Sequence, residues 1–198
     1  MIAYQALFLV ITYVIAAIPF GFLLTKKFSK KDIRELGSKN IGATNVSRIA
    51  GKKLGLLTLI LDGLKGAIMV IIARFSFYDA GNLHLFLVLV AATAVIAHIY
   101  PIYLNFKGGK GVATAIAVLL TLDFSVGFLA ICFWIMSFCL FRISSIASLI
   151  AIFSSIILSS AYDSPTSQLI FCGLLFILIF IRHKENIIRL ITGEEKKL

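Results

Sequence analysis

Residues 124–141 read FSVGFLAICFWIMSFCLF, a run without a single charged side chain. A helix that crosses the hydrocarbon core of a bilayer needs about 20 apolar residues, or about 17 at the short end. Asp123 and Arg142 bound the run, so its apolar length fits one crossing. The stretch therefore predicts a membrane-spanning helix.

The sequence on both sides repeats this pattern. Of the 198 residues, 60% are hydrophobic and 14% are charged, and the mean hydropathy is +1.03. Soluble domains are about half apolar and a quarter charged, so these values exclude a soluble globular domain, and they also exclude a disordered chain, a disulfide scaffold or a coiled coil. The length predicts a single domain, 1–198. Further uncharged runs lie at 1–25, 80–106, 111–122, 143–162 and 164–181, and another apolar stretch at about 54–73 contains only Asp62 and Lys65 as charged residues.

The run at 111–122 is short for a crossing, because a helix of that length spans about 18 Å. Charge placement tests whether it crosses, since lysine and arginine concentrate on the cytoplasmic side of membrane proteins. If it crosses and the N-terminus is outside, the segments 25–53, 105–111, 142–145 and 182–198 are inside and hold 17 of the 19 Lys and Arg residues. We therefore expect an all-α integral membrane protein with about seven transmembrane helices, the N-terminus outside, the C-terminus cytoplasmic and the fourth helix short.

Polar residues interrupt the apolar pattern in three segments, all on the expected inner face. The first runs from Lys26 to Lys53. It contains SKKD at 29–32, which resembles a helix-capping box, and Gly37 is a typical helix stop. We expect a short surface helix over 30–36. Its lysines suit either an electrostatic anchor to anionic lipid or a substrate site.

The same segment continues with GSKNIGATNVSR at 37–48, which mixes glycines, hydroxyls and amides with the cations Lys39 and Arg48. Glycine lets backbone approach a ligand closely, and charged donors make strong hydrogen bonds to oxyanions. This composition indicates a phosphate site. An ordinary polar turn is the alternative, although no Asp or Glu occurs from 36 to 61.

The second segment is NFKGGKGVAT at 105–114, in which three glycines and two lysines open the short fourth helix. Exposed N–H groups at a helix start bind anions, and glycines allow the chain to fold around an anion as a nest. A Walker A pattern is absent. The alternative is a cytoplasmic loop whose glycines form turns and whose lysines only orient the protein.

The third segment starts at RHKEN, 182–186. If the last membrane helix continues into it, His183 and Asn186 share a face while Glu185 points elsewhere. An interfacial histidine without a function is the alternative. At membrane depth, Asp62 and Lys65 are also three residues apart and form either a functional pair or a structural one. We expect His98 to be a helix-packing histidine first.

Together these segments resemble the acyl-phosphate-dependent glycerol-3-phosphate acyltransferases, a family of small bacterial inner-membrane enzymes. The matching stretches are GSKNIGATNVSR at 37–48, NFKGGKGVAT at 105–114 and RHKENIIRLITGEE at 182–195, and LDGLKG at 61–66 is also similar. The family commonly has glycine where Lys39 stands and phenylalanine where Tyr100 stands. The resemblance implies seven spans, an active site facing the cytoplasm, and transfer of a fatty acyl group from acyl phosphate to the sn-1 hydroxyl of glycerol 3-phosphate, which gives lysophosphatidic acid and phosphate.

Matching motif positions carry the residue roles that the resemblance implies. The catalytic set is Ser38, Lys110, His183 and Asn186. The substrate- and phosphate-binding set is Asn40, Thr44, Asn45, Arg48, Lys107, Gly108, Gly109 and Gly111. Asp62, Lys65 and His98 are supporting candidates.

Several alternatives stay open at this point. The hydroxyl proton of the acceptor goes either to His183 or to a phosphate oxygen of the substrate, and Ser38 is a possible acylated nucleophile, although direct transfer is simpler. A membrane transporter of a phosphorylated metabolite is the rival function, because the short helix and its lysine–glycine loop suit a half-helix anion site. We expect no metal, cofactor, nucleic acid or obligate protein partner; the expected partners are the two substrates and membrane lipid.

Overall fold

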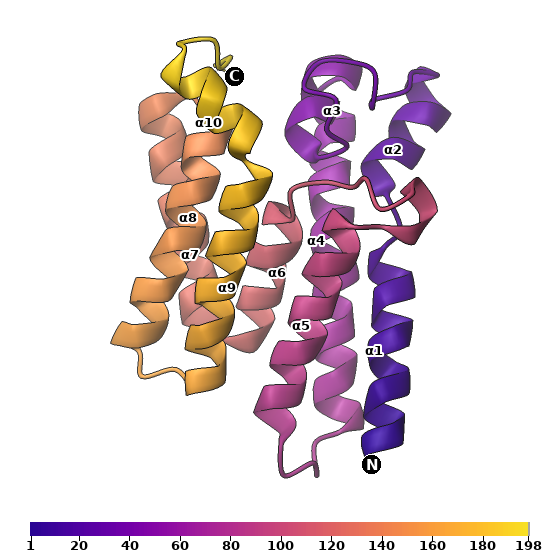
Figure 1. Cartoon of the computed structure of the whole chain (residues 1–198), viewed down its shortest axis with the longest axis vertical. Coiled ribbons are helices and arrows are strands. Elements are labelled where there is room, and N and C mark those ends of the chain that lie inside the picture. Colours follow the sequence, from indigo (N-terminus) through magenta and orange to yellow (C-terminus); the bar gives the residue numbers. More distant parts are fainter. Residues whose placement is uncertain (198) are drawn as a thin grey trace. The chain divides into compact units, whose positions relative to one another are not determined.

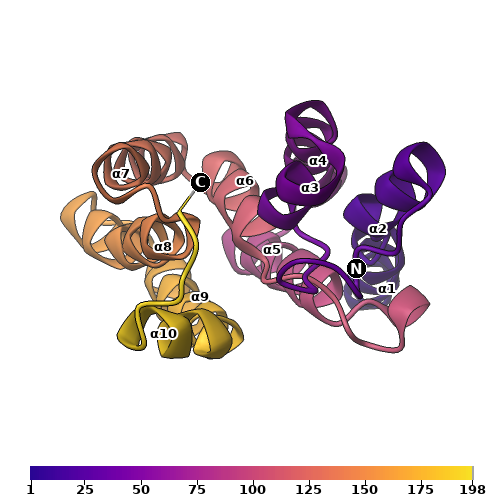
Figure 2. The ribbon, with the colours of Figure 1, turned by 90° about the horizontal axis from the view of Figure 1, so that it is seen from above.

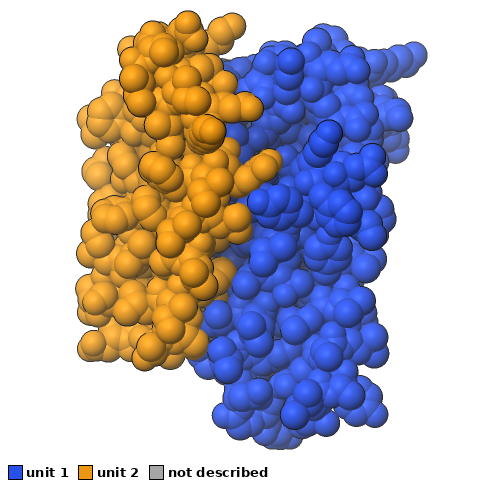
Figure 3. Space-filling model, viewed as in Figure 1, with its two compact units in different colours: residues 1–118 blue, residues 119–198 orange. Residues whose placement is uncertain are grey.

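The computed structural model describes residues 1–197, and in this range the regular structure is helical throughout (Figure 1). The elements in chain order are α1 (Ile2–Ala16), α2 (Phe20–Leu24), the π-helical η1 (Thr25–Ser29), α3 (Ala43–Ala50), α4 (Lys52–Ser76), α5 (Leu83–Ile99), the 3-10 segment η2 (Ile102–Leu104), α6 (Val112–Leu122), α7 (Phe124–Phe141), α8 (Ser144–Ala161), α9 (Thr166–Arg182) and α10 (Lys184–Ile191). The chain forms two compact units, Met1–Val118 and Leu119–Leu198, coloured blue and orange in Figure 3. The single domain expected from the length stays a prediction.

The first unit is built around α4, which contacts α1, α2, α3 and α5 (Figures 1 and 2). Its buried face is lined with small residues, among them Gly63 and Gly66. A Cβ at Gly66 would lie 2.7 Å from the Thr114 methyl group, so this glycine lets the start of α6 approach α4 closely. Small residues serve the same purpose at helix contacts in membranes generally, where close packing replaces the hydrophobic effect.

Proline breaks the first apolar stretch. Pro19 has no N–H and disfavours a helical residue before it, so α1 ends at Ala16 and α2 starts at Phe20. The break exposes the Ile18 carbonyl, which accepts a hydrogen bond from the Lys65 ammonium at 2.8 Å. The basic residue inside the membrane therefore bonds to a backbone group that the proline break has released.

The two ends of the first unit differ in character. The N-terminal end of α1 lies beside the α4–α5 turn, where Phe8, Phe77 and Phe86 pack edge to face and Gln5 donates to Asn82. The opposite end carries η1, α3 and the loop before α6 (Figure 1). Both phosphate-site segments of this unit therefore lie at the same end.

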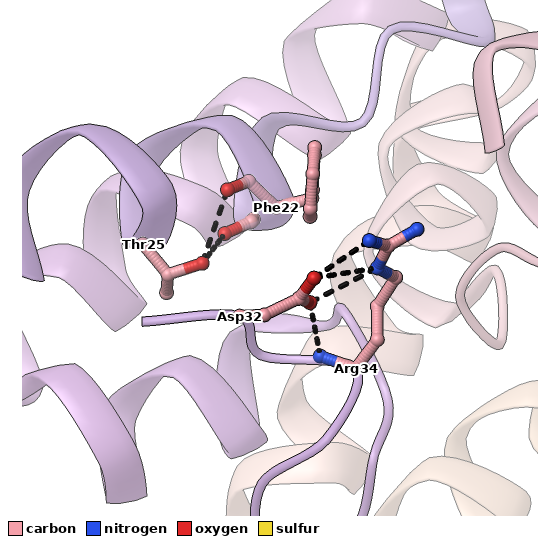
Figure 4. Close-up of polar contacts among 5 residues, drawn as sticks. Phe22, Thr25, Asp32 and Arg34 are labelled. Carbon is pink, nitrogen blue, oxygen red and sulfur yellow. Dashed lines mark hydrogen bonds and ion pairs between the residues drawn. The ribbon is translucent and has the colours of Figure 1, made fainter. Parts of the chain in front are cut away.

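The surface helix expected over 30–36 is wrong. The chain ends η1 with Lys30 in the left-handed conformation, φ 54°, and continues as turns. Asp32 does not cap a helix; it accepts hydrogen bonds from the Arg34 guanidinium, with Oδ2 2.6 Å from Nη2 (Figure 4). These bonds lower the pKa of the Asp32 carboxyl from 3.8 to about 2. This local ion pair favours a turn over the helix that the capping pattern predicts.

The second unit packs α7 against α8 and α8 against α9, and a bend of 61° at His183 separates α9 from α10. At one end Asp123 caps α7 by accepting from Val126 N, and Ser164 and Gln168 extend this polar cluster. At the other end, a hydrogen bond from Ser145 to Glu195 joins the first turn of α8 to the segment that follows α10. The basic residues of the unit thus lie at the second end, together with Glu195, while the first end carries Asp123.

Five helical stretches of the described residues are long and apolar enough to cross a membrane, namely Ile2–Ser29, Lys52–Ser76, Leu83–Leu104, Phe124–Phe141 and Ser144–Ala161. The bent pair α9 and α10 makes a sixth candidate, and α6 is a shorter apolar helix. The expectation of an all-α membrane protein is confirmed at this level.

Candidate active site

Asn45 organises the glycine-rich segment at 37–48. Its side chain is 2% exposed and lies in α3, facing back onto the loop. The Oδ1 atom accepts the Ser38 N–H at 3.0 Å, and the Nδ2 group donates to the carbonyls of Leu36 and Asn40, both at 2.9 Å. The Asn45 side-chain amide therefore holds the loop through hydrogen bonds to the backbone of three of its residues. These contacts give Asn45 a role in shaping the loop, where a substrate-binding role was expected.

Two more positions of this loop have local explanations. The Asn40 Oδ1 atom accepts the Gly42 N–H at 2.8 Å, so this amide forms a turn with its own backbone. Lys39 has φ 56°, a left-handed conformation that glycine adopts at little cost. A glycine at this position would adopt the turn at less cost, and lysine adopts it under strain.

Ser38, Thr44 and Arg48 are half-buried at the surface of this loop and of α3. They are held in place by a hydrophobic cluster under the loop, which consists of Ile33, Ile41, Val46 and Leu104. Leu104 lies in η2, directly before the lysine–glycine segment, so this cluster joins the bases of the two loops. The structure brings the first and second predicted segments together at one end of the first unit.

The lysine–glycine loop, residues 107–111, packs on the C-terminal end of α5. The N–H groups of Gly108 and Gly109 donate to the carbonyls of Ile99 and His98, at 3.0 and 3.2 Å. These two hydrogen bonds dock the loop on α5, and phosphate binding by this glycine segment stays a prediction. Lys107 is exposed, Lys110 is half-buried, and Gly111 leads into the first turn of α6 with φ 88°.

The three supporting candidates are all buried beneath this loop. The Lys65 ammonium lies 2.9 Å from Asp62 Oδ1 within α4, and His98 Nδ1 of α5 lies 3.6 Å from the same oxygen. Their side chains are at most 4% exposed. The structure brings the pair and the histidine into one cluster.

The third segment lies in the second unit, at the bend between α9 and α10. His183 and Asn186 are 3% and 6% exposed, while Glu185 is exposed, as the three-residue spacing predicts. His183 Nδ1 lies 2.8 Å from the Ile179 carbonyl, which can only accept a hydrogen bond. Nδ1 of the neutral ring therefore carries the hydrogen, and Nε2 carries the lone pair.

Glu195 belongs to this segment, although the residue spacing gave it no role. Its Oε1 atom accepts from Asn186 Nδ2 at 2.6 Å and from Ser145 Oγ at 2.9 Å, and Oε2 accepts from Arg189 Nε at 2.7 Å. The carboxylate thus fixes the orientation of the Asn186 amide. One feature of the sequence could have pointed to Glu195, namely a glycine followed by two glutamates after an amphipathic helix.

The hydrogen bonds to Glu195 also determine its charge. Burial raises the pKa of the carboxyl, but the bonds from Asn186, Arg189 and Ser145 outweigh burial and hold the pKa below its ordinary value of 4.5. A carboxylate with a depressed pKa stabilises the fold above its ordinary pKa, and this contribution is lost as the pH falls through the depressed value. At neutral pH the contribution is complete.

We expect Glu195→Gln to lower the Tm of the detergent-solubilised protein by about 2–4 °C at pH 7, because the charged acceptor is lost. The gap in Tm between wild type and variant should narrow as the pH falls below the ordinary carboxyl pKa and close once the pH has passed through the depressed pKa of Glu195, where the wild-type carboxyl is protonated. Thermal unfolding of both proteins from pH 3 to pH 8 measures this gap. A gap that stays constant over the whole range contradicts the assignment.

Comparison with known proteins gives a consistent result. The family model described as "Glycerol-3-phosphate acyltransferase" matches residues 6–193. The chain is 43% identical to the glycerol-3-phosphate acyltransferase of Caulobacter vibrioides (strain NA1000 / CB15N), over 100% of this chain and 90% of the relative. It is 45% identical to that of Paramagnetospirillum magneticum (strain ATCC 700264 / AMB-1), over 94% of this chain and 90% of the relative.

Solved structures agree with these relatives. One is the crystal structure of PlsY (YgiH), an integral membrane glycerol 3-phosphate acyltransferase, in its glycerol 3-phosphate form; it matches with a TM-score of 0.92 and 36% identity, over 98% of this chain and 96% of that chain. The lysophosphatidic acid form of the same protein matches with a TM-score of 0.88 over 98% of this chain and 95% of that chain. The resemblance seen in the three motifs is thus confirmed by matches over nearly the whole chain, and the protein belongs to the glycerol-3-phosphate acyltransferase family.

Proposed function

We propose that the protein transfers a fatty acyl group from acyl phosphate to the sn-1 hydroxyl of glycerol 3-phosphate. Family membership carries the acceptor and the reaction class, and the match to PlsY structures with glycerol 3-phosphate and with lysophosphatidic acid supports both the substrate and the product. The phosphate donor is supported by the cations Arg48, in α3, and Lys110, in the lysine–glycine loop, because one hydrophobic cluster lies under both segments.

The chemistry requires little from a general acid. Acyl phosphate is a mixed anhydride, so phosphate leaves readily once the acceptor hydroxyl oxygen has attacked the acyl carbonyl carbon. The new ester C–O bond forms, the C–O bond to phosphate breaks, and the hydroxyl proton passes to a base. Cations that hold the two phosphates and polarise the carbonyl therefore provide most of the catalysis.

Residue roles follow from this demand. Arg48 holds a phosphate through its planar fork, and Ser38 and Thr44 add hydroxyl donors from the same segment. Lys110, at the end of its loop, binds phosphate and polarises the carbonyl. His183 receives the hydroxyl proton on Nε2, the atom left basic by the bond from Nδ1 to Ile179, and Asn186 orients the acceptor.

Direct transfer needs no acylated enzyme. Ser38 lies in a loop shaped by Asn45 and next to a strained Lys39, a position that suits a hydrogen-bond donor as well as a nucleophile. Mixing the purified protein with radiolabelled acyl phosphate alone separates the two routes. Direct transfer leaves no label on the denatured protein, whereas label trapped on Ser38 overturns it.

We further propose seven spans in the bacterial inner membrane, with the N-terminus outside and the three motif segments on the cytoplasmic face. The count adds α6 and the bent pair α9 and α10 to the five long stretches. Seventeen of the 19 lysines and arginines then lie inside, which supports this orientation. The acyl chain of the donor reaches the protein from the surrounding lipid.

This topology predicts opposite accessibilities for two cysteine substitutions, Asp163→Cys and Lys196→Cys, in a background where Cys132, Cys139 and Cys172 are alanine. In intact cells, a membrane-impermeant maleimide should label residue 163 and leave residue 196 unlabelled until the membrane is permeabilised. Labelling of residue 196 in intact cells would contradict the proposed orientation.

The activity itself is tested with purified protein in detergent. Incubation with acyl phosphate and glycerol 3-phosphate should release phosphate and form lysophosphatidic acid in equal amounts, and omission of either substrate should abolish both. Activity with an acyl thioester in place of acyl phosphate would overturn the donor but keep the acceptor. Absence of turnover with any acyl donor would refute the proposed function.

A further inference from the structure

Asp62, Lys65 and His98 form a cluster that no step of the proposed reaction uses. Asp62 and Lys65 are 2% and 5% exposed and His98 is 4% exposed, although each can carry a charge. Ionisable groups at membrane depth are expensive unless they are paired, and they usually mark a functional region. The cluster is therefore unlike an ordinary helix contact, which small apolar residues would make.

The cluster and its turn of α4 hold two other segments of the first unit. The Lys65 ammonium bridges Asp62 Oδ1 and the Ile18 carbonyl at the proline break, at 2.9 and 2.8 Å. The Thr114 hydroxyl, in the first turn of α6, donates to the Asp62 carbonyl at 2.8 Å. One turn of α4 thus fixes both the α1–α2 break and the start of the helix that follows the lysine–glycine loop.

His98 connects this turn to the loop itself. Its Nδ1 atom faces Asp62 Oδ1 at 3.6 Å, and the far side of its ring abuts the Gly109 backbone. A Cβ added to Gly109 would overlap His98 Nε2 and lie 2.9 Å from Cε1. The His98 carbonyl accepts the Gly109 N–H at 3.2 Å. Both the ring and the backbone of His98 therefore contact the residue directly before Lys110.

We infer that His98, held by Asp62, is a positioning residue that sets the place of Lys110 by supporting the lysine–glycine loop from below. The loop has few side chains of its own with which to pack, because three of its five residues are glycine. Its conformation depends on the surface beneath it, and the His98 ring supplies the part of that surface that lies against Gly109. Lys65 acts indirectly, by neutralising the buried carboxylate that holds the imidazole.

The effect that this inference predicts on kcat rests on the proposed acyl transfer. The effect that it predicts on hydrogen exchange in the loop rests on geometry alone. Loss of the His98 support should move Lys110, and a displacement of about 1 Å in a catalytic group lowers the rate by about 10²-fold. The amides of Gly108 and Gly109 should also exchange faster with solvent, because their acceptors are the last carbonyls of α5.

A matched pair of double variants tests the support without leaving a buried charge. Asp62→Asn with Lys65→Met removes both charges but keeps an acceptor oxygen facing His98. Asp62→Leu with Lys65→Met removes the charges and the acceptor at similar volume. We expect the leucine variant to have a kcat about 10²-fold below that of the asparagine variant, and at least about 10-fold faster hydrogen exchange in a peptide covering 105–111.

His98→Ala gives an independent measurement in which the Asp62–Lys65 pair stays intact, and it should show the same loss of kcat and loop protection. Met69→Ala is the control, because it removes a buried side chain of α4 that is 2% exposed and lies one turn past Lys65. It should lower the Tm without changing loop exchange. Equal loop exchange and kcat in the two double variants, or unchanged loop exchange in His98→Ala, overturns the inference. A wild-type protein without acyl transfer defeats the proposed function, while loop exchange still decides the positioning role.

Discussion

Lys110→Ala should lower kcat/KM for acyl transfer by about 10²–10³-fold. The lysine ends a loop whose two preceding N–H groups are already bonded to α5, so the ammonium is the main charged donor that this loop offers to a phosphate and to the developing oxyanion. Removing one such donor costs about this factor in well-studied acyl transfer enzymes. Release of phosphate from acyl phosphate in the presence of glycerol 3-phosphate measures the effect.

Lys53→Ala is the matched control, because Lys53 is an exposed lysine in the first turn of α4 with no assigned role. It should retain wild-type kcat/KM, which separates the loss of a particular cation from a general loss of positive charge. Arg48→Ala should also be severely impaired. Full activity in both Lys110→Ala and Arg48→Ala would refute the assignment of the two phosphate-binding loops.

His183→Asn should lower kcat by about 10²–10⁴-fold. Asparagine is small enough to fit the buried bend between α9 and α10, and its amide N–H can still donate to the Ile179 carbonyl as Nδ1 does. It has no basic nitrogen at the position of Nε2, so the substitution removes the proton acceptor and little else. General-base catalysis contributes about this factor. Single-turnover measurements of lysophosphatidic acid formation give the rate of the chemical step.

The alternative acceptor, a phosphate oxygen of the substrate, makes a different prediction for the same variant. The rate of the chemical step would then fall by less than about 10-fold, because the histidine would only orient the acceptor. His84→Ala is the control, since His84 lies in the first turn of α5, at the end of the first unit away from the two loops. It should retain the wild-type rate.

The membrane character and the positions of the motifs could be predicted from the sequence because they depend on long uncharged runs and on short patterns of residue types. The helix start after the glycines at 108–111 and the shared face of His183 and Asn186 are also local, and the structure places them as the spacing indicates. The break at Pro19 within the first apolar run was not predicted, although proline is a local signal for it. Charge and periodicity act over a few residues, so a linear reading captures them.

Other features depend on contacts between distant residues. The Asn45 side chain accepts a hydrogen bond from the N–H of Ser38, seven residues away, and the spacing of polar residues does not reveal in which direction a side chain points. Substrate binding by Asn45 stays a prediction. The link from Ser145 to Glu195 spans 50 residues and two elements. The prediction of a helix over 30–36 was wrong because of a contact that is very local. The ion pair between Asp32 and Arg34, only two residues apart, competes with the helix cap expected at 29–32.

The hydrogen bond from Lys65 to the Ile18 carbonyl has a consequence for how the protein is made. The chain is synthesised from its N-terminus, so the proline break near the middle of Ile2–Ser29 is made before its donor, which lies 47 residues further on. Before Lys65 is in place, the Ile18 carbonyl keeps the local bond from the Phe20 N–H, and a weakly satisfied backbone group is costly in lipid. The first span is therefore expected to become fully stable in lipid only when α4 packs beside it.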